Sequence, residues 1–109
     1  MAFSTYNFRK EKLTSALEHL AAAFISKDGP LSPLITVTRS ELSDSGRHIT
    51  ILVSVLPETE EKNAIEFLTN NKKGFSDYVQ EHGQVMRMPS FDFKIDEGEK
   101  NRRIVEDII

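Results

Sequence analysis

Positively charged side chains occur in short clusters in this sequence, and their chemistry suits the binding of phosphate groups. Lys72 and Lys73 stand directly before Gly74 and what we expect to be the start of a helix. Ammonium groups at such a position bind anions well, because the backbone N–H groups and the helix dipole add to their charge. The candidate nucleic-acid contacts are Arg9, Lys10, Lys12, Arg47, Lys72, Lys73, Gly74 and Arg87.

Each cluster also has a simpler explanation, and both interpretations stay open at this point. Residues 72–74 can form a solvated turn between two helices, and the cluster at residues 9–12 can be a solvated helix face. Positive charge at the start of a helix opposes the helix dipole. An external anion that binds the cluster at residues 9–12 is therefore weakly favoured. Arg87 can face either a nucleic acid or Glu66.

Other chemistries find little support. The sequence has no cysteine, which excludes disulfides, thiolate nucleophiles and cysteine-based metal sites. Its histidines, His19, His48 and His82, belong to three different predicted elements, so we expect no metal site and no cofactor. A serine, histidine and aspartate set can be assembled from residues 76, 82 and 77, but no nucleophile elbow accompanies it. We therefore expect no catalytic residues and no enzymatic activity.

Length and charge set bounds on the protein. The 109 residues, 39% of them hydrophobic, fit one domain over residues 1–109 with one modest core. The net charge of −3, from 17 acidic and 14 basic residues, weakens a simple nucleic-acid hypothesis and directs attention to how the charges are distributed. No apolar run approaches the roughly 18 residues of a membrane span, and no signal peptide is visible. We expect a cytoplasmic monomer with no membrane partner.

The elements that position these charges follow from hydrophobic periodicity and turn residues. Leucines and a phenylalanine recur at helical spacing over residues 7–25, and a glycine–proline stop follows at residues 27–30. β-Branched residues predict strands at 34–42 and 48–56, joined by a tight turn that ends in Gly46. Because one face of the second strand is more apolar, helices should cover one side of the sheet and leave the other partly open.

The second half of the chain predicts two helices, a third strand and a tail helix. Pro57 and the acidic residues after it begin a helix, which we expect to break at Gly74. A second helix ends at residues 82–83, a strand follows Pro89, and a short helix covers residues 99–109. The order α-β-β-α-α-β is that of a KH-type II α+β fold with a three-stranded sheet. The side chains expected in the core are Leu17, Leu20, Val53, Val55, Leu68 and Phe93.

Several stretches resemble the ribosome-binding factor A family. They are Pro33-Leu34-Ile35-Thr36-Val37-Thr38, Leu42-Ser43-Asp44-Ser45-Gly46-Arg47-His48, Ile51-Leu52-Val53-Ser54-Val55-Leu56 and Pro89-Ser90-Phe91-Asp92-Phe93. The family looks like KH domains that lack the Gly-x-x-Gly loop and carry an Ala-x-Gly between two helices. The matching residues here are Lys72-Lys73-Gly74, so the glycine is kept and the alanine position is a lysine.

The resemblance implies an RNA-binding assembly factor that acts in maturation of the bacterial small ribosomal subunit, on its ribosomal RNA, without catalysis. The alternative is a KH-like protein–protein interaction module without direct RNA binding, which would suit the acidic surface. Steep salt dependence of binding separates the two, because phosphate contacts release counterions and an apolar protein interface does not. The two phenylalanines of the third predicted strand, Phe91 and Phe93, can stack RNA bases or fill the core.

Overall fold

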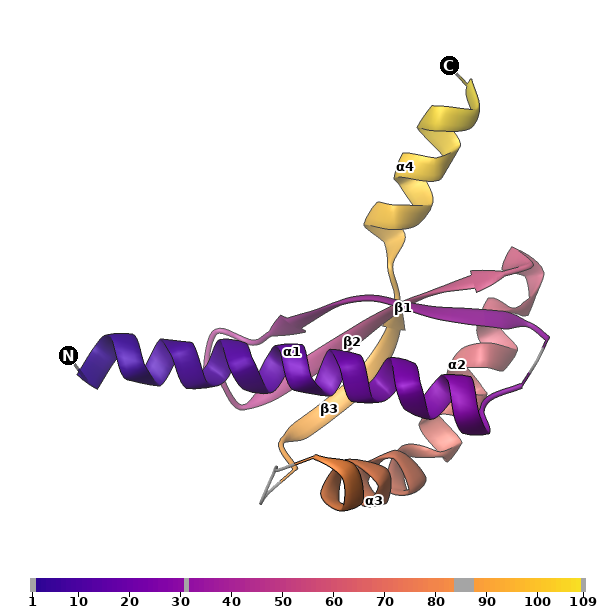
Figure 1. Ribbon diagram of the computed structural model, residues 1–109. Helices are drawn as coiled ribbons and strands as arrows, with labels where there is room; N and C mark the ends of the chain where they lie inside the picture. The colour runs from indigo at the N-terminus through magenta and orange to yellow at the C-terminus, as the bar shows by residue number, and fades with distance from the viewer. Residues whose placement is uncertain (1, 31, 84–87, 109) are drawn as a thin grey trace.

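A three-stranded mixed sheet covered on one face by three helices forms the body of the protein. Figure 1 shows the computed structural model, which describes the backbone of residues 2–30, 32–83 and 88–108. Within the first and last helices, side chains are described only for residues 12–28 and 97–102. The element order is that of the KH-type II α+β fold, as predicted.

The first helix and the hairpin follow the sequence signals closely. Helix α1 spans Ala2–Asp28, five residues longer at its start than predicted. Gly29 ends it: its amide donates to the Ile25 carbonyl, and a Cβ at this position would lie 2.4 Å from that oxygen. Strands β1, Leu34–Leu42, and β2, His48–Leu56, have the predicted bounds. The turn between them uses Gly46 at a φ of 74°, a conformation that favours glycine.

The sheet has the order β1-β2-β3, with β3 spanning Ser90–Ile95. Strands β1 and β2 pair antiparallel, with a register shift between Val37 and Arg39. Strands β2 and β3 pair parallel, and His48 lies opposite Ser90 at the start of both. The tip of the hairpin and the start of β3 therefore lie at the same end of the sheet.

All three covering helices contribute to one core. Ile49, Ile51, Val53 and Val55 point from β2 into this core and are fully buried. They meet side chains of α1, α2 and α3, so the apolar face of β2 is the covered face, as predicted. Five of the six predicted core residues are buried. Leu20 is only partly buried, because it packs at the margin of the core rather than inside it.

The break between the second and third helices is at Asn71 and not at Gly74, which corrects the sequence prediction. A 3-10 turn at Glu58–Glu60 leads into α2, Glu61–Asn70, and α3 spans Lys72–His82. Asn71 has φ −106° and ψ 17°, and its side-chain amide donates to the Phe67 carbonyl at 2.7 Å. The asparagine side chain thus satisfies a carbonyl at the end of α2, while Gly74 lies in the first turn of α3 with helical geometry.

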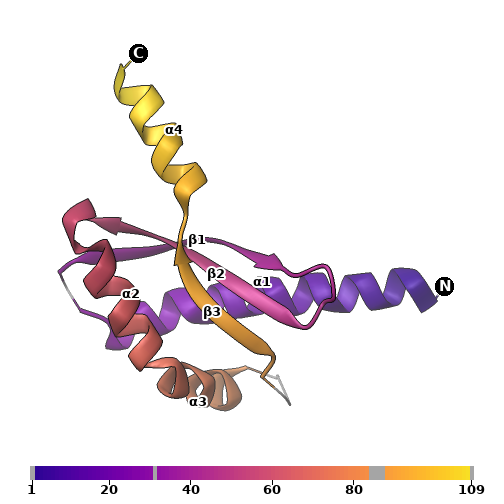
Figure 2. The same ribbon diagram turned by 180° about the vertical axis from the view of Figure 1, so that it is seen from behind.

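The last helix, α4, Glu97–Ile108, stands away from the body in both views (Figure 2). Its first turn is held by Asp96, which is 4% exposed. One carboxylate oxygen accepts the Glu99 amide at 3.0 Å, and the other accepts the Thr38 hydroxyl at 2.6 Å. Arg39 lies 3.4 Å from the same carboxylate. These contacts tie the start of α4 to the sheet. Among the described residues, no helix is long and apolar enough to cross a membrane.

Removing the Asp96 charge should destabilise the fold in a pH-dependent way. Burial acts to raise the pKa of Asp96, but hydrogen bonds from Thr38 and the Glu99 amide, together with the Arg39 guanidinium, outweigh it and lower the pKa below its ordinary value of 3.8. The Asp96 carboxylate therefore contributes its full stabilisation at pH values above 3.8. This stabilisation is lost as the pH falls through the lower pKa of the folded state.

We expect Asp96→Asn to lower the free energy of unfolding by about 1–3 kcal/mol near neutral pH. Because the wild type loses the carboxylate contribution in acid, the difference should shrink as the pH falls below 4. Urea unfolding near neutral pH and below pH 4 measures this difference in the free energy of unfolding. Asp44→Asn, at an exposed aspartate, is the control. A difference that stays constant over this pH range would contradict the stabilising role of the Asp96 carboxylate.

Candidate nucleic-acid interface

Lys72 occupies the first position of α3 and projects over the edge strand of the sheet. Its Nζ lies 4.7 Å from the centre of the Phe91 ring in β3, a cation–π geometry. The side chain is half-buried, and no carboxylate among the described residues pairs with its ammonium. The ring thus holds the charge in place without neutralising it. Phe91 and Phe93 are 6% and 5% exposed, so they fill the core and do not present faces for bases.

Lys73, the next residue, is in a different environment. Its side chain is 88% exposed and its Nζ lies 3.0 Å from Asp77. An exposed pair of this kind, one helical turn apart, contributes little to stability and exchanges readily with other partners. Gly74 is also exposed, and it faces α1. The three predicted residues at this position therefore differ in role, with Lys72 as the most available charge.

The start of α3 has no side-chain cap. Asn71 precedes the helix, but its side-chain amide is used on the preceding turn at Phe67. The α3 amino terminus is consequently not neutralised by a carboxylate or hydroxyl of its capping residue, and its dipole adds to the charge of Lys72. This combination suits a phosphate oxygen.

Of the remaining predicted contacts, Lys12 and Arg47 lie toward the hairpin end of the sheet. The Ser40 hydroxyl donates to Glu18 at 3.1 Å and lies 3.4 Å from the Thr14 carbonyl, which fastens this part of α1 to β1. Lys12 is exposed on the same stretch of α1, and Arg47 is exposed just before β2. The side chains of Arg9 and Lys10 lie outside the described residues, and so does the whole of Arg87.

The sheet register relates the two groups of charges. Phe91, under Lys72, pairs with Ile49, which follows Arg47 by two residues. Lys72 and Arg47 therefore both belong to the part of the molecule where β2 and β3 begin. Sequence clustering alone did not indicate this relation, because it depends on the parallel pairing of β2 with β3.

A polar array on the open face of the sheet was not predicted. The Nε2 atom of His48 donates to Asp92 at 2.8 Å, and Nδ1 lies 2.9 Å from the Ser90 hydroxyl. Burial acts to raise the pKa of Asp92, but hydrogen bonds from His48 and Thr50 lower it below its ordinary value. His48 and Asp92 are 38% and 35% exposed, so the array lies at the surface and bridges β2 to β3. Its residues are 42 and 44 positions apart, so only the strand pairing reveals it.

The serine, histidine and aspartate set considered from the sequence does not assemble. His82 donates to the Tyr78 carbonyl at 3.1 Å, and Asp77 pairs with Lys73. Within the part of the chain that the structure describes, no three histidine, aspartate or glutamate side chains are grouped to hold a metal ion. The His82 and Asp77 side chains therefore each bond within α3 and not to one another.

Comparison with known proteins shows which family the sequence matches. A profile of the ribosome-binding factor A family matches residues 9–109. A curated relative from Fervidobacterium nodosum, named ribosome-binding factor A, is 33% identical over 70 residues, which is 63% of this chain. The matched segment spans 56% of that relative's length.

Solved structures share the fold. The crystal structure of ribosome-binding factor A from Thermus thermophilus superposes with a TM-score of 0.68 at 22% identity, covering 79% of this chain and 93% of that one. A homology model of the T. thermophilus protein, fitted into a cryo-electron microscopy map of its complex with the 30S subunit, gives a TM-score of 0.61 at 21% identity. It covers 82% of this chain and 92% of its own. With the family profile matching almost the whole sequence, the chain belongs to the ribosome-binding factor A family.

Proposed function

We propose that this protein binds the small ribosomal subunit through its ribosomal RNA and acts as a non-catalytic assembly factor in subunit maturation. The observation that carries the proposal is the Lys72 ammonium, held over the Phe91 ring beside the uncapped start of α3 and paired with no described carboxylate. Family membership supports the proposal, as does the 30S complex of the T. thermophilus protein. The same proposal holds that the protein is a monomer in the cytoplasm.

The mode of RNA binding follows from which groups are available. No two glycines of this sequence have Gly-x-x-Gly spacing, so the backbone clamp of typical KH domains is absent. Lys72, Arg47 and Lys12 instead supply cationic side chains toward phosphates, from α3, the hairpin and α1. Phosphate contacts position a protein on RNA without reading its sequence, so recognition rests on the shape of a folded RNA segment.

Lys73 contributes less in this proposal than its neighbour. Its charge is already balanced by Asp77, and a phosphate would have to displace that carboxylate. The displacement is cheap at an exposed position but removes part of the electrostatic gain. Substitutions at the two adjacent lysines should therefore have different effects on RNA binding, a difference that the sequence alone does not indicate.

We expect Lys72→Ala to weaken association with immature small subunits and to reduce the salt slope of binding by close to one unit, as for loss of one phosphate contact. Lys73→Ala should have a smaller effect on both quantities. Co-sedimentation over a series of salt concentrations measures both. Lys62→Ala, at an exposed lysine of α2, is the matched control for loss of one surface charge.

Stability must be measured beside affinity, because Lys72→Ala also removes the contact with Phe91. That contact accounts for only about 0.5–1 kcal/mol, so the variant should stay folded. If a folded Lys72→Ala protein binds with the affinity and salt slope of the Lys62→Ala control, Lys72 is an ordinary solvated residue and the proposed interface is wrong.

A further inference from the structure

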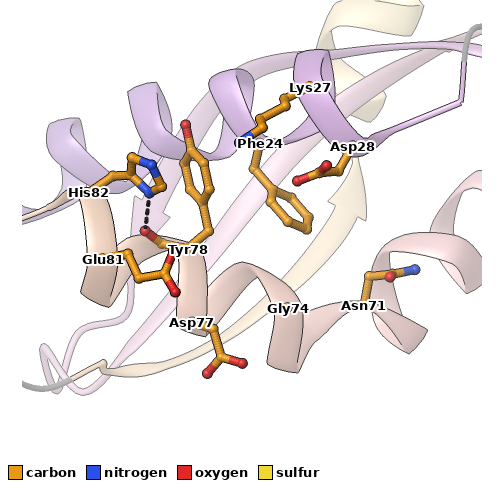
Figure 3. Close-up of a pocket in the computed structure, with 9 residues that line it drawn as sticks. All are labelled: Phe24, Lys27, Asp28, Asn71, Gly74, Asp77, Tyr78, Glu81 and His82. Carbon is orange, nitrogen blue, oxygen red and sulfur yellow. Dashed lines mark hydrogen bonds between the residues drawn. The ribbon is translucent and has the colours of Figure 1, made fainter.

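The two sides of α1 are covered to different extents. On the side toward α3, the Phe24 ring packs against Tyr78 and is only 6% exposed (Figure 3). On the side toward β1, a groove of about 380 Å³ lies open along the end of the helix. Ala22, Ile25 and Ser26 line the groove from α1, and residues 34–37 line it from β1.

The groove is apolar and uncharged. Ile25 and Ile35 lie deepest in it, each 7% exposed, and they belong to the hydrophobic core. Ala22, Ser26 and Thr36 are exposed along its walls. None of the described residues that line it carries a charge. A phosphate backbone is held by cationic side chains, so this groove matches an uncharged occupant and not an RNA strand.

Strand β1 is also an edge of the sheet. Within the part of the chain that the structure describes, it pairs with β2 on one side and with no strand on the other. The backbone N–H and C=O groups on its outer side can therefore pair with a further strand. With nine residues, β1 is longer than the usual strand of about 5–6 residues, so the edge that it presents is long.

Only one half of this edge has the features by which proteins prevent unwanted strand pairing. From Val37 onward the register shifts and the charged residues Arg39 and Glu41 follow, and both features protect an edge. From Leu34 to Val37 the register is regular, no residue is charged, and Leu34 is 58% exposed. The unprotected half of β1 is the half that lines the groove. A free edge and an apolar groove therefore coincide.

We propose that residues 34–37 of β1 accept an extended segment of a partner protein as a fourth strand of the sheet. The main chain of the segment bonds the free edge of β1. Because successive side chains of a strand point to opposite faces, alternate side chains of the segment enter the groove over Ile25 and Ile35. The segment is uncharged where it pairs and carries small or aliphatic side chains at these alternate positions, in keeping with the neutral lining.

The size of the site favours a partner segment over a second copy of this chain. A stable protein–protein interface involves about 20–30 residues on each side. This site offers the four edge residues and a few residues at the end of α1. A single strand needs no larger surface. Leu34 pairs with Leu56 at the end of β2, away from the hairpin, so the site is separate from the proposed RNA contacts of Lys72 and Arg47.

The probe for this site is the blocked pentapeptide acetyl-Thr-Val-Thr-Val-Thr-amide, with amide chemical shifts of the full chain as the readout. We expect a saturable titration that moves the amides of residues 34–37, Ala22 and Ser26. Ala22→Glu places a charge in the groove and should weaken binding by about tenfold or more. Ala23→Glu adds the same charge at an exposed position of α1 that does not line the groove, and it should bind like the wild type.

A second pair of variants tests the edge itself. Leu34→Lys puts a charge on the unprotected half of β1 and should weaken peptide binding to a similar extent. Leu56 is the cross-strand neighbour of Leu34, is 48% exposed and does not line the groove. Leu56→Lys should therefore bind the peptide like the wild type. All four substitutions are at exposed positions, so the variants should stay folded.

Several outcomes would overturn the proposal. They are the absence of a saturable shift, equal binding by Ala22→Glu and Ala23→Glu, and saturation of the same amides by a uridine oligonucleotide. Strand addition is also refuted if the peptide binds as tightly after N-methylation of its three central residues, because that change removes N–H donors from both of its edges. Self-association of the wild type that Ala22→Glu abolishes would assign the edge to a second copy.

Ribosomal RNA binding is independent of this site. Ala22→Glu and Ala23→Glu should bind small-subunit ribosomal RNA equally, and Lys72→Ala should bind the peptide like the wild type. A loss of RNA binding in Ala22→Glu that Ala23→Glu does not share would assign the groove to RNA and refute the partner segment.

Discussion

Phe75→Ala should lower the free energy of unfolding by about 3–5 kcal/mol, the largest loss expected of any single truncation in this protein. The side chain is fully buried. Its ring lies within 5.4–5.8 Å of those of Phe24, Phe91 and Phe93, so it joins α1, α3 and β3. Alanine would leave a cavity at the point where these three elements meet, and the surrounding rings cannot all move into it.

Urea unfolding of the wild type and the variant measures this loss, and Leu20→Ala is the comparison. Leu20 packs only at the margin of the same core, so its truncation should cost clearly less. A loss below about 1 kcal/mol for Phe75→Ala would contradict this packing. Because Phe91 also supports Lys72, a folded Phe75→Ala variant should bind the subunit less tightly as well.

The strands were predictable because their signals are local. Alternating β-branched residues and the turn before His48 gave the bounds of β1 and β2 correctly. The helix break was placed three residues too late, because glycine is a general helix breaker and Asn71 is not an obvious one. What decides the position is the hydrogen bond from the Asn71 side chain to the Phe67 carbonyl, which depends on the local geometry.

The candidate site was predictable in composition and not in arrangement. The Lys73–Asp77 pair has the four-residue spacing of helical ion pairs, so the sequence contained a local signal for it, although the pair was not predicted. The contact of Lys72 with Phe91 joins α3 to a strand that follows it, and only the packed fold shows it. The same holds for the array at His48 and for the groove between α1 and β1, because each depends on the register or packing of separate elements.

Strong salt dependence is the second large effect that we expect. Three phosphate contacts, from Lys72, Arg47 and Lys12, correspond to a slope of about −2 to −3 in a plot of log affinity against log salt. Affinity for small-subunit ribosomal RNA should then fall by roughly 16–64-fold between 50 and 200 mM salt. The overall negative charge of the chain, −3, does not cancel this effect, because counterion release depends on the local contacts.

The most direct test of the central claim is therefore the affinity of the wild-type protein for protein-free small-subunit ribosomal RNA, measured over that range of salt concentrations. We predict binding at low salt, a linear decline with the slope given above, and a slope shallower by about one unit in Lys72→Ala. Absence of binding at low salt, or binding that salt does not weaken, would contradict the claim. The alternative of a KH-like module that binds only protein partners would then take its place.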